Sequence, residues 1–419
     1  MKFHVKSYGC SANHAESEII AGKLCKEGQL VNEEDAELVV LNICTVKGDK
    51  TALTEIRKVK QKYPNKKIAI TGCVTDSIVA PIKQIDPEVQ LINTHHIDKI
   101  DELLRVKTDV LTKAKPVKLM LPRVRRNPVV GIVPISSGCL DACGFCSTRL
   151  VKGTLFSYPP EIIVNEVRKC VDDGCKQIWI TGQDTCCYGF DRKTNLAVLL
   201  KKIVEGVPGD YKIRVGMGNP RHIPKYLHEL IEVMKHPNIF KFLHIPVQAG
   251  NNEVLKAMRR GHTVETFKEL VNAFRNELPE MTFSTDLIVG YPTETEEQFQ
   301  DTLQLVKDFK PDSVNIARFA PRPGTSAATM EQQVHGNIAK ERSRKLAKVF
   351  KENALEQNKN WIGWEGEVSV EDEAKDGMNC RNYAYKLIIV RENVKAGQEM
   401  LVKIIEAHDN WLIGERIPF

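Results

Sequence analysis

The chain has 419 residues, of which 42% are hydrophobic and 27% are charged, and its formal net charge is +6. This length predicts roughly two to four domains, and the composition excludes a disordered or collagen-like chain. The small positive surplus permits an anionic partner without requiring one.

Twelve cysteines are too few for a disulfide-dense secreted scaffold. The sequence shows no signal-peptide core and no apolar run of the roughly 18–20 residues that a membrane helix needs. We therefore expect a cytoplasmic protein without a membrane segment, whose cysteines are metal ligands, catalysts or buried apolar residues.

Residues 1–104 predict a small α/β domain. Charged, helix-like stretches separate four strand-like runs, at 3–8, 37–43, 67–71 and 89–92. Such alternation is typical of a parallel sheet with helices on its faces.

Three cysteines of this domain, Cys10, Cys44 and Cys73, each follow the end of a predicted strand. The carboxyl ends of neighbouring parallel strands border one crevice, so the three thiols can converge on one metal site. The alternative is that they are small buried apolar residues. The coincidence of three such positions favours the metal site.

Residues 105–128 form a predicted basic linker. Its part from 105 to 126 holds eight Lys or Arg and one acidic residue, a net charge of +7 that exceeds the charge of the whole chain. One interpretation is a solvated linker. The other is a linker that also contacts phosphate, because a dense basic stripe attracts a polyanion by releasing its counterions.

Residues 129–355 predict an incomplete (β/α)6 barrel of the TIM type, open on one side, because six units are too few to close an eightfold barrel. Its strand-like runs lie at 131–135, 176–181, 211–217, 240–245, 282–289 and 313–319. After the fifth run, Thr293 and Glu296 have the spacing of a capping box and predict a helix start.

Residues 356–419 predict a small all-β barrel of four or five strands. From Trp361 onward this tail is acidic, with seven basic and eleven acidic residues. Its charge argues against a leading role in binding an anionic partner. The linker and the basic segment 340–351 are the better candidates for that role.

The segment SSGCLDACGFCS places Cys139, Cys143 and Cys146 at C-x3-C-x2-C spacing, directly after the first barrel strand. Thiolates select zinc, copper(I) or iron–sulfur clusters. Structural zinc is disfavoured, since it takes four ligands and no fourth Cys or His is near in sequence. Three thiolates on a four-iron cluster leave one iron open to a substrate or cofactor.

This motif on this loop resembles the radical S-adenosylmethionine (SAM) enzymes. Further motifs resemble their methylthiotransferase branch, in order along essentially the whole chain: YGC-x2-N-x2-E-S-E at 8–18, LNICTV at 41–46, TGCV at 71–74, GQD at 182–184, HIPVQAGNNEVLKAMRRG at 244–261, DLIVGYPTET at 286–295 and RPGTSA at 322–327. The tail is similar to the small β-barrel, called TRAM, that ends these proteins.

The resemblance implies two [4Fe–4S] clusters and SAM as cofactors. One cluster would be held by Cys139, Cys143 and Cys146, with SAM on its open iron, and the other by Cys10, Cys44 and Cys73. In the family, one SAM methylates a sulfur on the second cluster. Another SAM yields the radical that removes the substrate hydrogen. No catalytic side chain beyond the cluster ligands is implied.

The resemblance also suggests cofactor-binding residues. Gln183 and Asp184 stand where the family holds the SAM amino group; the alternative is an ordinary capped loop. Phe145 stands where the family places an aromatic side chain beside the adenine, and Gln248 is a candidate pocket residue.

Two further pairs of residues lie at strand ends. Gly290 and Pro292 are expected to shape the backbone near the adenine, because glycine permits close approach. Arg318 and Arg322 are expected to contact substrate or phosphate rather than form surface salt bridges.

Stretches around both cysteine sets, including SSGCLDACGFCSTRLVKGTLFSYPPEIIVNEV and RVGMGNPRHI, resemble the archaeal and eukaryotic enzymes for N6-threonylcarbamoyladenosine (t6A) at position 37 of tRNA. This implies the tRNA anticodon loop as partner and an electron donor such as a flavodoxin or ferredoxin. The sulfur donor is not indicated. Alternatives are methylthiotransfer to a ribosomal-protein aspartate or another tRNA adenosine, or a non-catalytic carrier of electrons or sulfur.

Overall fold

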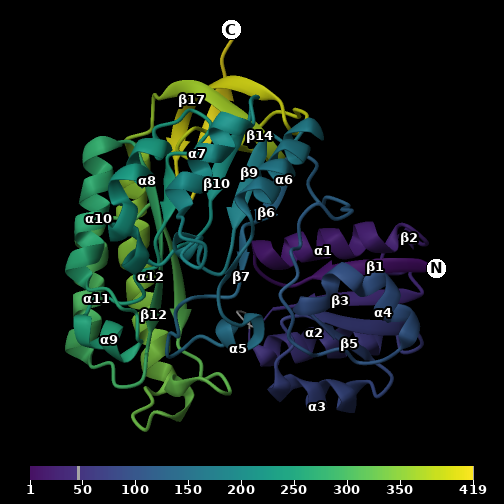
Figure 1. Cartoon of the computed structure of the whole chain (residues 1–419). Helices are drawn as coiled ribbons and strands as arrows, with labels where there is room; N and C mark the ends of the chain where they lie inside the picture. Colours follow the sequence, from purple (N-terminus) through teal and green to yellow (C-terminus); the bar gives the residue numbers. More distant parts are fainter. Residues whose placement is uncertain (45–47, 419) are drawn as a thin grey trace.

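The computed structural model describes residues 1–44 and 48–418, so Thr45 and Val46 of the LNICTV motif and Phe419 lie outside the described residues. Figure 1 shows an N-terminal α/β unit beside a larger central unit, with the C-terminal strands at one end of the latter. Of the helices in the described ranges, none combines the length and apolar composition that crossing a membrane demands.

The N-terminal unit is built on a parallel sheet in the order β2-β1-β3-β4-β5. Its strands are β1 (Lys2–Ser7), β2 (Gln29–Leu30), β3 (Leu38–Ile43), β4 (Lys67–Gly72) and β5 (Gln90–Asn93). Its helices are α1 (Ser11–Leu24), α2 (Asp49–Lys62), α3 (Asp76–Ile85), η2 (Thr94–Lys99) and α4 (Ile100–Val106).

Every residue of β3 is buried, and its alternate side chains enter two apolar clusters. Val39 and Leu41 belong to one cluster, and Leu38 and Val40 belong to the other. Both faces of the sheet are therefore covered, as a parallel sheet requires. The predicted parallel α/β architecture is confirmed, and the short edge strand β2 is an addition to it.

The central unit contains the six predicted strands, in two parallel sheets of three, β10-β9-β6 and β11-β12-β13. The strands are β6 (Val130–Pro134), β9 (Gln177–Thr181), β10 (Lys212–Val215), β11 (Phe242–His244), β12 (Thr282–Val289) and β13 (Ser313–Arg318). Between β10 and β11 the only β-pairing within the described residues is an isolated bridge from Ile213 to Ile239. The six strands therefore form two halves rather than one continuous ladder.

Helices follow the strands and surround one large apolar core. They are α5 (Thr148–Lys152), α6 (Pro160–Asp172), η3 (Thr185–Cys187), α7 (Leu196–Gly206), η4 (Pro220–Tyr226), α8 (Leu227–Met234), α9 (Asn252–Ala257), α10 (Val264–Glu277), α11 (Glu296–Phe309), η5 (Ser326–Thr329) and α12 (Gly336–Lys359). A small ribbon of β7 (Ser136–Ser137) and β8 (Phe156–Ser157) flanks α5.

The predicted capping box is two residues out of place. Thr295, not Thr293, caps α11, and its side chain and that of Gln298 bond reciprocally to each other's backbone N–H. Thr293 has a positive φ of 73° and donates its N–H to the carbonyl of Gln332, so it belongs to the preceding turn. Each threonine has a Glu or Gln three residues later, Glu296 after Thr293 and Gln298 after Thr295, so the sequence pattern fits both. Only the backbone conformation distinguishes the residue that caps the helix.

The C-terminal strands close into a barrel in the order β14-β15-β16-β18-β17. They are β14 (Glu365–Ala374), β15 (Gly377–Arg381), β16 (Leu387–Val390), β17 (Glu399–Ala407) and β18 (Leu412–Arg416). This barrel covers the amino-terminal ends of the central strands (Figure 1). There Lys241 N–H bonds to the carbonyl of Tyr383, Thr282 Oγ1 bonds to the carbonyl of Ala384, and Lys386 pairs with Asp312 at 2.6 Å.

The N-terminal unit meets the central unit along α1. Ala15 is fully buried in a small apolar cluster with Val130 and Ile132 of β6, the edge strand of its sheet. About two turns later, a Cβ on Gly22 would lie 2.4 Å from backbone atoms of Pro122 and Arg123. The linker therefore crosses α1 at a distance that only glycine permits.

We expect Gly22→Ala to lower the free energy of unfolding by about 1–3 kcal/mol, because the new methyl group must displace backbone and not a flexible side chain. Urea titration and limited proteolysis of the 105–128 segment measure the effect. Gly336→Ala is the control, since nothing lies within 4 Å of a Cβ built there. Equal stability of the two variants contradicts the close docking of the linker.

Candidate functional site

The structure brings the thiols of Cys10, Cys44 and Cys73 together. Cys10 is the N-cap of α1, Cys44 directly follows β3 and Cys73 directly follows β4. The Cys44 thiol is hydrogen-bonded to both of the other two. Cys10 is exposed, whereas Cys44 and Cys73 are buried. The site is therefore a crevice at the carboxyl edge of the sheet with one side open.

Electrostatics at this crevice favour metal binding. The hydrogen bond from Cys44 lowers the pKa of Cys10 to about 6 and that of Cys73 to about 7, and the ammonium group of Lys152 acts in the same direction. The same hydrogen bonds raise the pKa of Cys44. Thiolates are the ligand form of cysteine, so two of the three thiols are prepared to bind a soft metal near neutral pH.

A buried pair of amides fixes this geometry. Asn13 donates to Asn42 Oδ1 at 3.0 Å and to the carbonyl of Ile43 at 2.9 Å, and it accepts from the Cys10 thiol at 3.2 Å. Asn42 donates back to the carbonyl of Asn13 at 2.8 Å. These bonds tie the start of α1 to the end of β3, so that Cys10 is held beside Cys44.

Two glycines leave room for the side chains of Cys44 and Asn42. A Cβ on Gly9 would lie 2.5 Å from Cys44 Cβ. Gly72 has a φ of 90°, and a Cβ there would lie 2.1 Å from Asn42 Oδ1. Only glycine accepts both the left-handed backbone and the close approach, which explains the residue before Cys10 and before Cys73.

The second cysteine loop, 139–146, lies at the carboxyl end of β6 and is fixed by backbone bonds to distant segments. Gly144 N–H bonds to the carbonyl of Met258 at 2.9 Å, and Ala327 N–H bonds to the carbonyl of Gly144 at 2.9 Å. Cys139, Cys143 and Cys146 are partly exposed. Burial raises the pKa of Cys143. Arg260 opposes this effect, because its guanidinium group donates to the Cys143 sulfur at 3.3 Å.

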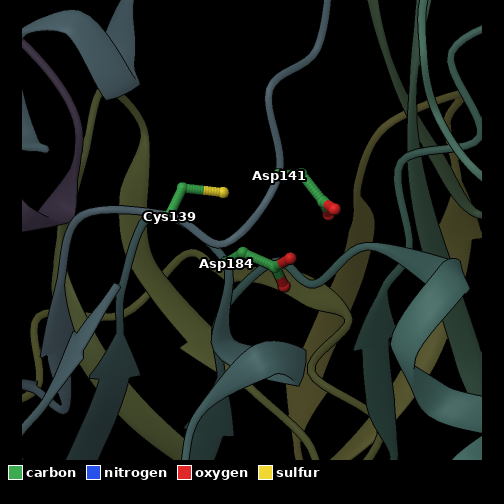
Figure 2. Close-up of side chains that lie close together, drawn as sticks. All are labelled: Cys139, Asp141 and Asp184. Atoms are coloured by element: carbon green, nitrogen blue, oxygen red, sulfur yellow. The ribbon is translucent and has the colours of Figure 1, made fainter. Parts of the chain in front are cut away.

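Two carboxylates border this loop. Cys139 Sγ and one oxygen each of Asp141 and Asp184 lie within 4.8 Å of one another, and Figure 2 shows the three side chains grouped around the loop. Asp141 is buried and accepts bonds of 2.8 Å from three side chains that follow β10, namely Asn219, Arg221 and His222. Asp141 therefore anchors the cysteine loop, which follows the first central strand, to the segment that follows the third.

Sequence reasoning missed Asp141, Asn219 and His222. They stand in two quoted stretches, SSGCLDACGFCS and RVGMGNPRHI, but about 80 residues separate the partners. The carboxylate inside a thiol loop was the available signal, because a buried carboxylate needs several donors.

Three buried oxygens at the carboxyl ends of β9 and β11 have no hydrogen-bond partner within the described residues. They are Gln183 Oε1, Asp184 Oδ2 and Gln248 Oε1. Burial also raises the pKa of Asp184, whose other oxygen accepts the N–H groups of Cys186 and Asn219. Unpartnered buried acceptors cost free energy, and a ligand with N–H donors, such as an amino group, would satisfy them.

The remaining predicted cofactor-binding residues have structural contacts of their own. Phe145 is half-buried and packs against the central core, and Pro292 is buried. A Cβ on Gly290 would lie 2.6 Å from Ala339 Cβ, so this glycine lets α12 approach the end of β12. That contact accounts for Gly290 through helix packing, a reason that differs from the expected approach to an adenine.

The two predicted substrate-binding arginines lie at and beyond the end of β13. Arg318 is exposed. Arg322 is partly exposed, and its backbone carbonyl accepts a bond from the Thr325 hydroxyl at 2.7 Å. The adjacent pair Cys186 and Cys187 is fully buried, and the Cys187 thiol donates to the carbonyl of Asp184 at 3.3 Å.

Much of the linker charge serves docking within the chain. Four of its eight basic residues form ion pairs: Arg105 with Glu27, Lys118 with Glu16, Arg123 with Glu166 and Arg125 with Asp173. Lys107, Lys113, Lys115 and Arg126 are exposed. The sequence interpretation of one continuous phosphate-binding stripe therefore overestimates the charge that the linker presents to a partner.

We expect Asn13→Ala to lower the free energy of unfolding by about 1–3 kcal/mol, because it leaves the buried Asn42 Oδ1 without its donor and removes one of the two donors to the Ile43 carbonyl. It should also reduce the iron that the N-terminal cysteines retain, since Cys10 loses its fixed position. Chemical denaturation and iron analysis after anaerobic reconstitution measure the two effects. The exposed Asn65→Ala serves as control, and identical iron retention in both variants would show that the amide pair does not organise the site.

Comparison with known proteins adds independent information. A profile of the Radical SAM superfamily matches residues 133–306, and one of the uncharacterized protein family UPF0004 matches residues 2–94. The chain is 40% identical over 431 residues to the "Probable threonylcarbamoyladenosine tRNA methylthiotransferase" of Pyrococcus horikoshii, with 100% of both chains covered. It is 35% identical over 433 residues to the human "Threonylcarbamoyladenosine tRNA methylthiotransferase", covering 99% of this chain and 74% of that one.

Among solved structures, the fold is similar to the radical S-adenosylmethionine methyltransferase TsrM from Kitasatospora setae, solved with cobalamin and a [4Fe-4S] cluster. The TM-score is 0.56 at 12% sequence identity, and the match covers 78% of this chain and 77% of that one. At this identity the likeness describes the fold alone.

Proposed function

Because the chain belongs to the threonylcarbamoyladenosine tRNA methylthiotransferases, we propose that it inserts a methylthio group at C2 of t6A at position 37 of tRNA. It is a radical SAM enzyme whose cofactors are two [4Fe–4S] clusters and SAM. One observation carries the proposal. Two sets of three thiols each lie at the carboxyl ends of parallel strands. The helices that begin after Cys10 and after Cys146, α1 and α5, contact each other through the ion pair of Glu16 and Lys152.

The thiols fit the two clusters. Cys139, Cys143 and Cys146 would hold the cluster that binds SAM, and Cys10, Cys44 and Cys73 would hold the other. Three thiolates suit an iron–sulfur cluster with one open iron. The lowered pKa values of Cys10 and Cys73 supply thiolates for the second site. The bond from Arg260 to Cys143 supplies a positive charge to the first.

The unpartnered acceptors beside the first cysteine loop fit the amino group of SAM. Asp184 would accept from it through Oδ2, with Gln183 and Gln248 offering further oxygens. Phe145 and Pro292 would flank the adenine. When bound, the clusters and SAM supply the radical that removes a hydrogen atom from the substrate carbon and the sulfur and methyl group that replace it.

The chain's own residues contribute position and exclusion of water. Asp141, held by Asn219, Arg221 and His222, keeps the cysteine loop against the barrel, and the Asn13–Asn42 pair keeps the N-terminal thiols together. Both sites therefore have a fixed geometry before a substrate arrives, which a reaction at an unactivated C–H bond requires.

The target base must leave its stack to reach these sites, as bases of single-stranded RNA loops do. Arg318 and Arg322 near the end of β13 would contact the substrate. The exposed linker residues Lys107, Lys113, Lys115 and Arg126 would contact phosphate, with the exposed basic residues of α12. An electron donor such as a flavodoxin or ferredoxin would supply the reducing equivalents.

We propose four parts for the chain: a methylthiotransferase domain at 1–104, the linker at 105–128, the radical SAM partial barrel at 129–355 and a TRAM-like barrel at 356–419. The closed order of strands β14 to β18 supports the last of these. This barrel lies at the amino-terminal ends of the central strands, whereas the cysteine loop 139–146 follows the carboxyl end of β6.

The first test reconstitutes the protein anaerobically with iron and sulfide and supplies SAM, a reductant and t6A-containing tRNA. We expect the digested tRNA to contain a methylthio adduct of t6A, identified by nucleoside mass spectrometry. Cys143→Ala should abolish formation of 5′-deoxyadenosine from SAM. Cys44→Ala should leave that cleavage intact and abolish the adduct, whereas the exposed Cys25→Ala should behave like the wild type.

The outcomes separate the parts of the proposal. Formation of 5′-deoxyadenosine without any nucleoside gaining mass would reject the tRNA substrate and make a ribosomal-protein aspartate the next one to test. A wild-type yield of adduct from Cys44→Ala would reject the N-terminal site.

A further inference from the structure

A buried cluster of charged residues lies where the N-terminal unit, the linker and the second cysteine loop meet. Glu16 of α1 accepts from Lys118 of the linker at 2.5 Å and from Lys152 of α5 at 2.7 Å. Thr94 donates to the same carboxylate oxygen at 2.6 Å. The side chains of the two lysines and the glutamate are each no more than 6% exposed. The cluster is thus closed to solvent.

The formal charges of this cluster do not balance. Two ammonium groups share one carboxylate, and the second oxygen of that carboxylate, Glu16 Oε2, has no hydrogen-bond partner within the described residues. The two lysines lower the pKa of Glu16 to about 2 although burial opposes this, so the carboxylate is ionised. The His95 ring lies nearby, with its two nitrogens against the carbonyls of Ala114 and Val151, and burial lowers its pKa. One positive charge remains.

Such an excess is costly, because an unpaired charge in a protein interior loses its hydration. Besides Glu16, the anionic groups that act most strongly on Lys152 are the thiols of Cys73 and Cys10. Burial lowers the pKa of Lys118, and Cys73 is again among the groups that oppose this effect. The geometry agrees, because Lys152 donates to the hydroxyl of Thr94, the residue directly after β5. The last residue of β5, Asn93, pairs with Gly72 of β4, so Thr94 lies beside Cys73 and the surplus charge lies next to the N-terminal cysteine site.

An oxidised four-iron cluster core carries two positive charges, and three thiolate ligands bring the total to one negative charge. That value equals the surplus of the buried cluster with the opposite sign. We propose that Lys152 is a positioning residue, which supplies from the radical SAM barrel the counter-charge for the cluster held by Cys10, Cys44 and Cys73. This inference rests on the proposed second cluster.

The position of Lys152 gives the counter-charge a second consequence. Lys152 is the last residue of α5, the helix that begins two residues after Cys146. A negative charge at the N-terminal cysteines attracts this helix, and with it the end of the other cysteine loop. The counter-charge thereby connects the N-terminal thiols to the end of the other cysteine loop.

The experiment uses the full chain with Cys139, Cys143 and Cys146 replaced by Ala, so that only the N-terminal site can hold a cluster. After anaerobic reconstitution, iron analysis and a redox titration followed by electron paramagnetic resonance report the occupancy and midpoint potential. About four iron atoms per chain are expected. Absence of iron in this background would reject the second cluster itself, independently of Lys152.

In this background, Lys152→Met should shift the midpoint potential to more negative values, because the added electron loses a nearby positive charge. Lys152→Arg should retain the potential. The matched control is the double variant Glu16→Gln with Lys118→Met, which breaks the same hydrogen bonds but keeps the net charge of the cluster. It should also retain the potential. An unchanged potential in Lys152→Met, or an equal shift in the double variant, would mean that the buried charged residues only hold the two units together, and it would overturn the proposal.

Discussion

The carboxylate of Glu16 is the point on which the arrangement of this chain depends. It lies on the helix that begins after Cys10, and it receives hydrogen bonds from the linker and from the helix that follows Cys146. A buried carboxylate tolerates few alternative geometries, because any movement that removes a donor exposes it to the full penalty of burial. The relative position of the two cysteine sites is therefore determined by charge as well as by apolar packing.

The two sites follow one architectural rule and are stabilised in different ways. Both lie at the carboxyl ends of parallel strands, where loops of different strands meet. At the N-terminal site, neutral amides and two glycines bring the cysteines together. At the barrel site, the buried carboxylate of Asp141 accepts hydrogen bonds from three side chains that follow β10. The first solution depends on close backbone approach and the second on ionic bonds.

Patterns that act locally or follow from topology could be predicted from the sequence. Hydrophobic alternation located the strands of the N-terminal sheet and of the central unit, and the rule for parallel strands placed Cys10, Cys44 and Cys73 at one edge. Contacts between distant residues could not be predicted. Asp141 and His222 are 81 positions apart, and nothing in either stretch names the other as partner. The positive linker likewise gave no sign that Arg123 and Lys118 are paired and buried.

The break between β10 and β11 leaves a seam in the central unit that few backbone hydrogen bonds cross. The cysteine loop starts from the first half, and its Gly144 and Cys143 are bonded to Met258 and Arg260 of the second. The loop thus spans the seam, so that its three sulfurs lie where the two halves of the central unit meet.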